Sequence, residues 1–104
     1  MIKKSFDEYK HSINSVLTNI TSEQLTGTIQ MIKKIIKKNG KVYVIGNGGS
    51  ASIASHVSVD FAKVARVPSS TFNNANLITC FANDYGYENW VTEAIKAYSN
   101  KNDM

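Results

Sequence analysis

A group of glycines directly after an apolar segment is the part of the sequence best suited to binding chemistry. Residues 46–50 read Gly-Asn-Gly-Gly-Ser, and residues 41–45 before them are β-branched and nearly all apolar. Glycine lets the backbone take left-handed angles and lets ligand atoms approach its N–H groups. The free N–H groups of a following helix favour an anion at the same place. Residues 46–50 are therefore predicted to form a strand-to-helix turn for the phosphate-bearing end of a sugar, with Ser50 as hydroxyl donor and helix cap.

The same residues disfavour two nucleotide-binding turns. A P-loop needs a lysine before its serine or threonine, and Gly49 stands before Ser50. The dinucleotide fingerprint needs a glycine at position 51, which is Ala51. A bare tight turn that binds nothing is the remaining alternative, but three glycines in four positions are more than such a turn needs.

His56 and Asp60 are the second group with chemical potential. They are four residues apart, so a helix from Ser50 to about Lys63 or Val64 projects them from one side, ~40° apart around its axis. Such a pair can ligate a metal ion or handle protons. It lies ~9 Å along the axis from the anion site, which a small phosphorylated sugar spans. The alternative is a surface ion pair worth at most ~0.5 kcal/mol.

Two helices are expected before the turn. Apolar residues at helical spacing predict one from about Ser5 to Ile20, with Phe6, Tyr9, Ile13, Val16, Leu17 and Ile20 on one stripe. Thr21 and Gln24 form a capping-box pattern that starts a second helix, which ends at Asn39-Gly40. Its buried stripe is expected to be Leu25, Ile29, Ile32, Ile35 and Ile36.

The remaining elements predict an open α/β architecture with parallel strands. Residues 41–45 suit a central strand covered on both faces, and the helix after the turn is expected to face it with Ile53, Val57, Phe61 and Val64. A strand over 69–72, a helix over 76–82, a turn over 83–86 and a helix over 88–98 follow. Two strands do not make a stable parallel sheet, so the chain is expected to be truncated before another strand.

Composition limits the other classes of function. Lys33, Lys34, Lys37 and Lys38 carry much of the net charge of +4, but they alternate with isoleucines as a solvated helix face does, so no nucleic-acid partner is expected. The single cysteine, Cys80, excludes an internal disulfide and is expected to be a small core residue, while His11 is expected at the surface.

No signal peptide or membrane span is predicted, which suggests a cytoplasmic protein. A domain of 104 residues is small enough that association would stabilise it.

Two motifs at their correct separation carry a family resemblance. Residues 46–56, Gly-Asn-Gly-Gly-Ser-Ala-Ser-Ile-Ala-Ser-His, with Asp60 and the Asn-Asp-Tyr-Gly-Tyr-Glu of residues 83–88, resemble the phosphoheptose isomerases, which are sedoheptulose 7-phosphate isomerases of the sugar isomerase (SIS) fold. The resemblance implies a three-layer αβα parallel sheet, flavodoxin-like or Rossmann-like, after two N-terminal helices. Residues 1–104 would form one partial SIS domain, with 1–39 as the helical pair and 40–104 as the first half of the α/β core. The family's third strand, second phosphate loop and C-terminal helix with a glutamine and a histidine have no counterpart in the sequence.

The resemblance also implies a reaction and a site. These enzymes convert sedoheptulose 7-phosphate to D-glycero-D-manno-heptose 7-phosphate through an enediol, at a site shared between subunits of a homotetramer. Transferred by position, the substrate-binding residues are Asn47, Gly48, Gly49, Ser50, Asp60, Asn83 and Asp84. His56 would be a zinc ligand, and Asp60 would ligate the metal and act as the base. The family usually has glutamate at position 60, and the shift of about 1 Å that the shorter side chain causes can cost as much as ~100-fold in rate.

Two other functions stay open at this stage. One is a non-catalytic SIS protein that binds sugar phosphates or a protein partner, such as the bacterial regulator that binds the replication initiator. The other is a chain that forms a stable oligomer by itself, with the stripes of the first two helices buried against a neighbour.

Overall fold

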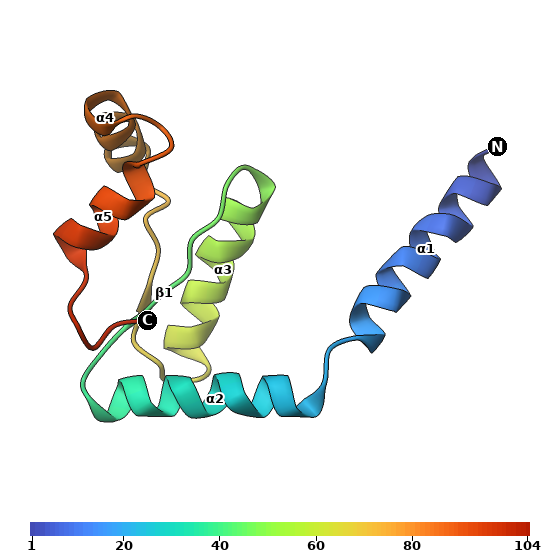
Figure 1. The fold of residues 1–104 in the computed structure, drawn as a ribbon, viewed down its shortest axis with the longest axis horizontal. Helices are drawn as coiled ribbons and strands as arrows, with labels where there is room; N and C mark the ends of the chain where they lie inside the picture. Colours follow the sequence, from blue (N-terminus) through green and yellow to red (C-terminus); the bar gives the residue numbers. More distant parts are fainter. The chain divides into compact units, whose positions relative to one another are not determined.

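The computed structural model describes residues 1–104, which divide into two compact units, Met1–Met31 and Ile32–Met104. The first unit holds α1 (Ile2–Thr18) and the beginning of α2 (Ser22–Lys37) (Figure 1). The predicted capping box is confirmed, because Thr21 N–H donates to Gln24 Oε1 at 2.9 Å and Gln24 N–H donates to Thr21 Oγ1 at 3.2 Å. None of the helices is long and apolar enough to cross a membrane.

The apolar stripes of these two helices are largely exposed. On α2, Leu25 is 56% and Ile29 51% exposed, and only Ile32 and Ile35 are half-buried, so the prediction of a buried stripe is wrong for most of its length. All six residues of the first predicted stripe are exposed as well, and the last of them, Ile20, lies beyond the end of α1. The spacing of apolar residues specifies which of them share a helix face. Burial of that face also needs a second apolar surface, and no such surface packs on the stripe residues within Met1–Met31.

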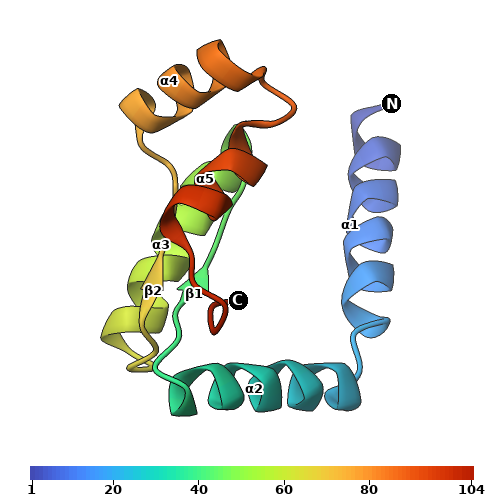
Figure 2. The ribbon, with the colours of Figure 1, turned by 60° about the vertical axis from the view of Figure 1, so that its left-hand side comes forward.

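The second unit is a small three-layer α/β arrangement. Its elements are β1 (Val42–Tyr43), α3 (Gly49–Lys63), β2 (Ser69–Ser70), α4 (Ala75–Tyr85) and α5 (Trp90–Tyr98). The two strands are parallel, with Val42 opposite Ser69 and Tyr43 opposite Ser70. Figures 1 and 2 show α3 on one side of the strands and α4 and α5 on the other, which confirms the predicted fold class.

The core of this unit lies between the strands and the last two helices. Phe72, Trp90 and Ala94 are buried there, and Tyr43 stacks on Phe72 with ring centroids 4.8 Å apart. The Tyr43 hydroxyl donates to the Tyr98 carbonyl at 2.8 Å. Packing of the rings and one satisfied hydroxyl thus attach α5 to β1.

Strand β1 is bonded along both of its edges. On one side it pairs with β2; on the other, Met104 N–H donates to the Lys41 carbonyl at 2.9 Å and the Met104 carbonyl accepts from Tyr43 N–H at 2.7 Å. This is the bonding pattern of parallel strands. A strand within residues 41–45 is confirmed at Val42–Tyr43, but the predicted central strand covered on both faces is not observed, because the sheet has two strands and Tyr43, Val44 and Ile45 are only half-buried.

The face that α3 turns to the strands differs from the prediction. Ala54 and Ser58 are the buried residues of this helix, whereas Ile53 is 66% and Val64 74% exposed. The small side chains of Ala54 and Ser58 let the helix approach the strands closely, and Ile53 and Val64 lie toward solvent. Of the four predicted residues, Val57 and Phe61 are half-buried, and the prediction is wrong for Ile53 and Val64.

Two further expectations are wrong. The predicted turn over residues 83–86 is wrong for its first three residues, because α4 continues through Asn83, Asp84 and Tyr85 and ends at Gly86, which has φ of +87°. Cys80 lies on the exposed side of the same helix instead of in the core. The turn at residues 83–86 and the core position of Cys80 were both predicted from residue type alone. The helix that contains these residues determines their conformation and their exposure.

Candidate functional site

The turn between β1 and α3 is closed by its own hydrogen bonds. The Ser50 hydroxyl donates to the Asn47 carbonyl and accepts from Asn47 N–H, both at 2.7 Å, and Ser50 N–H donates to the same carbonyl at 3.1 Å. A Cβ at Gly46 would overlap the Ser50 carbonyl, and Gly48 has φ of +56°. Position 46 therefore requires glycine because the Ser50 carbonyl approaches it closely. Position 48 requires glycine because its backbone has a positive φ.

Ser50 has a different place from the one predicted. The helix begins at Gly49 with Gly48 as its cap, and no side chain bonds the cap position, so the prediction of a serine cap is wrong. Ser50 is the second residue of the helix, and its hydroxyl shapes the turn from inside. The chain bends so tightly here that this hydroxyl reaches back to both backbone groups of Asn47.

The closed turn leaves two backbone donors free. The N–H groups of Gly48 and Gly49 have no acceptor in the chain, and both residues are exposed. They lie at the carboxyl end of a parallel strand and at the start of a helix, where the aligned peptide dipoles favour negative charge. The predicted strand-to-helix turn is confirmed, and its arrangement suits an anion.

Tyr87 is a residue of this region that sequence reasoning missed. Its hydroxyl donates to Asn47 Oδ1 at 2.7 Å across 40 residues of sequence. The residue belongs to the 83–88 motif, but nothing in the order of residues indicates its partner. A second long-range bond, from Asn73 Nδ2 to Ser55 Oγ at 2.7 Å, connects the segment after β2 to α3.

His56 and Asp60 contact each other on the exposed side of α3. His56 Nε2 lies 3.4 Å from Asp60 Oδ2, and the side chains are 80% and 54% exposed. His56 stands two residues after the buried Ala54, about 200° around the helix, so the pair faces away from the strands. The prediction that the two residues share one side is confirmed.

The spacing of this pair fits two ligands of one zinc ion. Nitrogen and oxygen ligands at 2.0–2.1 Å in a tetrahedral site are separated by about 3.3 Å, close to the observed 3.4 Å. However, no group of three or more His, Cys, Asp and Glu side chains gathers anywhere in the chain. The chain thus supplies at most two of the four corners that zinc requires.

Asn83 and Asp84 lie side by side in the last turn of α4. Asn83 Nδ2 donates to Asp84 Oδ1 at 3.0 Å, and the Cys80 thiol lies 3.8 Å from Asp84 Oδ2. Both residues are exposed. Tyr87 lies in the loop after these two residues, and its hydroxyl bonds Asn47. The end of α4 is thus connected to the turn through Tyr87. Neither Asn83 nor Asp84 contacts the turn directly.

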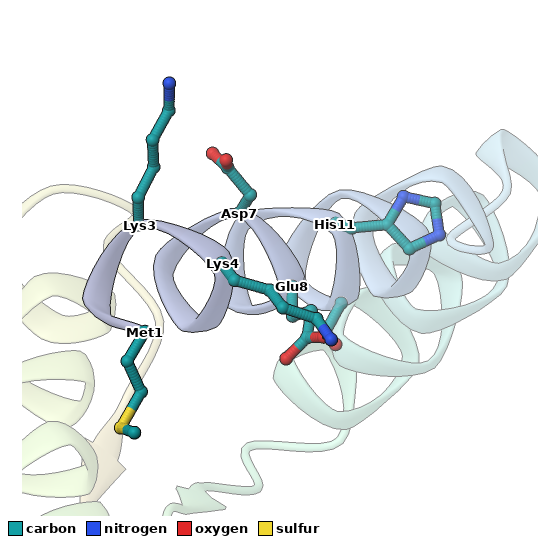
Figure 3. Close-up of a pocket in the computed structure, with 7 residues that line it drawn as sticks. Met1, Lys3, Lys4, Asp7, Glu8 and His11 are labelled. Atoms are coloured by element: carbon teal, nitrogen blue, oxygen red, sulfur yellow. The ribbon is translucent and has the colours of Figure 1, made fainter.

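A separate hollow on α1 has no features of a binding site. It is lined by Met1, Lys3, Lys4, Asp7, Glu8, His11 and Ser12, all from one helix. Figure 3 shows these side chains pointing in different directions rather than converging on one point. His11 is exposed, as predicted.

Comparison with known proteins places the chain among sugar isomerase domains. The sequence profile of the SIS domain matches residues 8–101. A phosphoheptose isomerase of Helicobacter pylori is 31% identical over 110 residues, covering all of this chain and 57% of that protein. A phosphoheptose isomerase of Fusobacterium nucleatum is 35% identical over 80 residues, covering 72% of this chain and 41% of that protein.

A solved structure supports the fold. Phosphoheptose isomerase GmhA from Neisseria gonorrhoeae matches 97% of this chain with a TM-score of 0.82 and 20% sequence identity, over 56% of its own chain. The chain therefore spans just over half the length of that enzyme and of the Helicobacter relative.

Proposed function

The chain belongs to the SIS domain family, and from this membership we propose that it serves a sugar-phosphate isomerase of the phosphoheptose isomerase type. The proposed reaction converts sedoheptulose 7-phosphate to D-glycero-D-manno-heptose 7-phosphate through an enediol. The observation that carries the proposal is the closed turn, which leaves the N–H groups of Gly48 and Gly49 free at the start of α3.

The turn is proposed to bind the phosphate-bearing end of the sugar. Gly48 and Gly49 would donate their backbone N–H groups, Asn47 would contribute its side chain, and Ser50 would keep the turn in shape. Asn83 and Asp84 are proposed as further substrate contacts from the end of α4. This assignment is supported by the bond between Tyr87 and Asn47, which connects that helix end to the turn.

Asp60 is proposed as the base. Conversion of a 2-ketose to an aldose requires a carboxylate that takes a proton from C1, the carbon next to the carbonyl, and returns it to C2 of the enediol. One proton also moves between the two oxygens, so the isomers have the same composition. Asp60 lies 11 residues after Gly49, about 16 Å along the helix axis.

Zinc is proposed as the cofactor, held in part by His56 and Asp60. When bound, a zinc ion would polarise the carbonyl and stabilise the charge that develops on its oxygen. The 3.4 Å spacing of the two side chains supports their common ligation, and the remaining ligands have to come from outside this pair.

Association of several copies, a homotetramer by analogy with the family, is proposed from the exposed stripe of α1. Phe6, Tyr9 and Val16 are each more than half exposed, and they lie with Ile13 and Leu17 on α1. Sedimentation of the chain at several concentrations tests the proposal. A monomer at every concentration would contradict it.

The direct test of the reaction is to incubate a full-length protein that contains residues 1–104 with sedoheptulose 7-phosphate and zinc and to follow aldose formation. We expect product to form, and we expect Asp60→Glu to raise turnover by as much as ~100-fold, because the longer side chain restores the reach of the base. Asp7→Asn, which removes a carboxylate from the exposed surface of α1, is the matched control and should change nothing. No turnover in the protein and in Asp60→Glu would exclude the enzyme, and sugar-phosphate binding without turnover would favour a non-catalytic SIS regulator.

A further inference from the structure

We propose that Tyr87 is a positioning residue, which orients the side-chain amide of Asn47 so that the turn presents only hydrogen-bond donors to its ligand. A carboxamide has an accepting end and a donating end, and a rotation of 180° exchanges them. The Tyr87 hydroxyl donates to Asn47 Oδ1 at 2.7 Å, which occupies the accepting end. The Nδ2 group, with two N–H donors, has no partner in the chain and is left for a ligand.

The acceptors nearest to the free donors are occupied inside the turn. The Asn47 carbonyl accepts from the N–H and the hydroxyl of Ser50, and the Gly48 carbonyl accepts from Ala51 N–H. The Ser50 hydroxyl has used its proton in that bond. What remains is the N–H of Gly48, the N–H of Gly49 and the Nδ2 group of Asn47. A group of free donors whose nearest acceptors are already engaged favours an oxyanion over a cation.

Tyr87 comes from a loop that is itself closed. Asn89 Nδ2 donates to the Tyr85 carbonyl at 2.9 Å, and Asn89 N–H donates to the Gly86 carbonyl at 3.1 Å. Gly86, with φ of +87°, ends α4 and starts this loop. The backbone of Tyr87 is therefore positioned by a loop that has its own hydrogen bonds. Fixing the two side-chain torsions of Tyr87 costs little conformational entropy.

The specificity of the turn thus depends on a contact between two segments 40 residues apart. Without the hydroxyl, Asn47 is free to rotate and to turn its oxygen toward the anion, where it would repel the ligand. The inference rests on the proposed function only in taking the ligand of the turn to be anionic.

The test is a titration of the 15N-labelled chain with inorganic phosphate, following the backbone amides of Gly48 and Gly49 and the side-chain amide of Asn47. We expect Tyr87→Phe to weaken phosphate binding by about 3- to 10-fold, the worth of one hydrogen bond, and to shift the Asn47 side-chain signal before any phosphate is added. Tyr85→Phe is the matched control: its hydroxyl makes no hydrogen bond in the chain and it is 52% exposed, so it should leave binding unchanged.

A double-mutant cycle separates positioning from a general structural effect. In an Asn47→Ala background, Tyr87→Phe should have no further effect on phosphate binding. An equal loss in both backgrounds would overturn the proposal, and so would an unperturbed Asn47 signal in Tyr87→Phe or the absence of phosphate binding at Gly48 and Gly49. The readout requires no turnover. A positive cycle in a protein that does not isomerise the sugar would therefore refute the proposed reaction and leave the role of Tyr87 intact.

Discussion

The glycine turn and the His56–Asp60 pair lie on the same helix, yet they differ in how far the chain completes them. The turn is held by three hydrogen bonds between Asn47 and Ser50 and by glycines that its geometry requires. The pair consists of two exposed side chains joined by a single 3.4 Å contact. Backbone donors are positioned by the fold itself, whereas exposed side chains wait for a ligand or a neighbour to fix them. We therefore expect binding at the turn and chemistry at the pair to be separable.

The largest expected effect that tests this separation is on turnover. Asp60→Asn should lower isomerase turnover by roughly 10²- to 10⁴-fold, because the amide does not accept the proton. Phosphate binding at the turn, measured by titration, should stay within about twofold, since the two sites share no hydrogen bond. Loss of both together would show that the turn and the pair form one cooperative unit.

The second test concerns the turn itself. Gly46→Ala should lower the free energy of unfolding by about 1–3 kcal/mol, because its Cβ would overlap the Ser50 carbonyl. Phosphate binding should fall as the turn opens. Gly49→Ala is the control, since no atom lies within 4 Å of a Cβ there; urea denaturation should show a change within about 0.5 kcal/mol. Equal effects of the two substitutions would contradict the packing argument.

The third test concerns the Asp103 carboxylate, which accepts hydrogen bonds from backbone N–H groups. The turn is proposed to bind phosphate through backbone N–H groups in the same way. Asp103 accepts from Asn100 N–H at 2.7 Å and from Lys41 N–H at 2.8 Å. The bond from Asn100 lowers the pKa of Asp103 most; the bond and charge of Lys41 lower it further, while desolvation opposes the shift.

Because the folded pKa lies below the unfolded value of about 3.9, the ionised form stabilises the fold. This contribution is complete above the unfolded pKa and is lost as pH falls through the folded pKa. Thermal melts from pH 7 to pH 3 should show a lower Tm for Asp103→Asn at pH 7 and a smaller decline in acid than in the parent chain. Parallel curves would contradict the role of this carboxylate.

The smallest expected effect is on the stability contributed by the pair. His56→Ala should change the free energy of unfolding by less than about 0.5 kcal/mol, because an exposed ion pair gains little in water. Urea denaturation without metal measures it. A loss well above 1 kcal/mol would mean that the pair has a structural role, and the contrast with the turn would then fail.

Local signals in the sequence predicted the elements well. The Thr21–Gln24 capping box, the strand-to-helix turn at residues 46–50 and the shared side of His56 and Asp60 are all present in the structure. Each depends on residues within about one helical turn of one another, where spacing determines geometry. The resemblance carried by residues 46–60 and 83–88 is confirmed by the SIS domain match.

The sequence by itself therefore determined the order of elements, the glycine turn and the family. Only the tertiary structure decided that Ala54 and Ser58 face the strands, that α4 continues through Asn83 and Asp84, and that Tyr87 bonds Asn47. These features depend on how closely two elements approach and on contacts between residues far apart in the chain. Neither hydrophobic periodicity nor turn composition contains that information, because both describe one segment at a time.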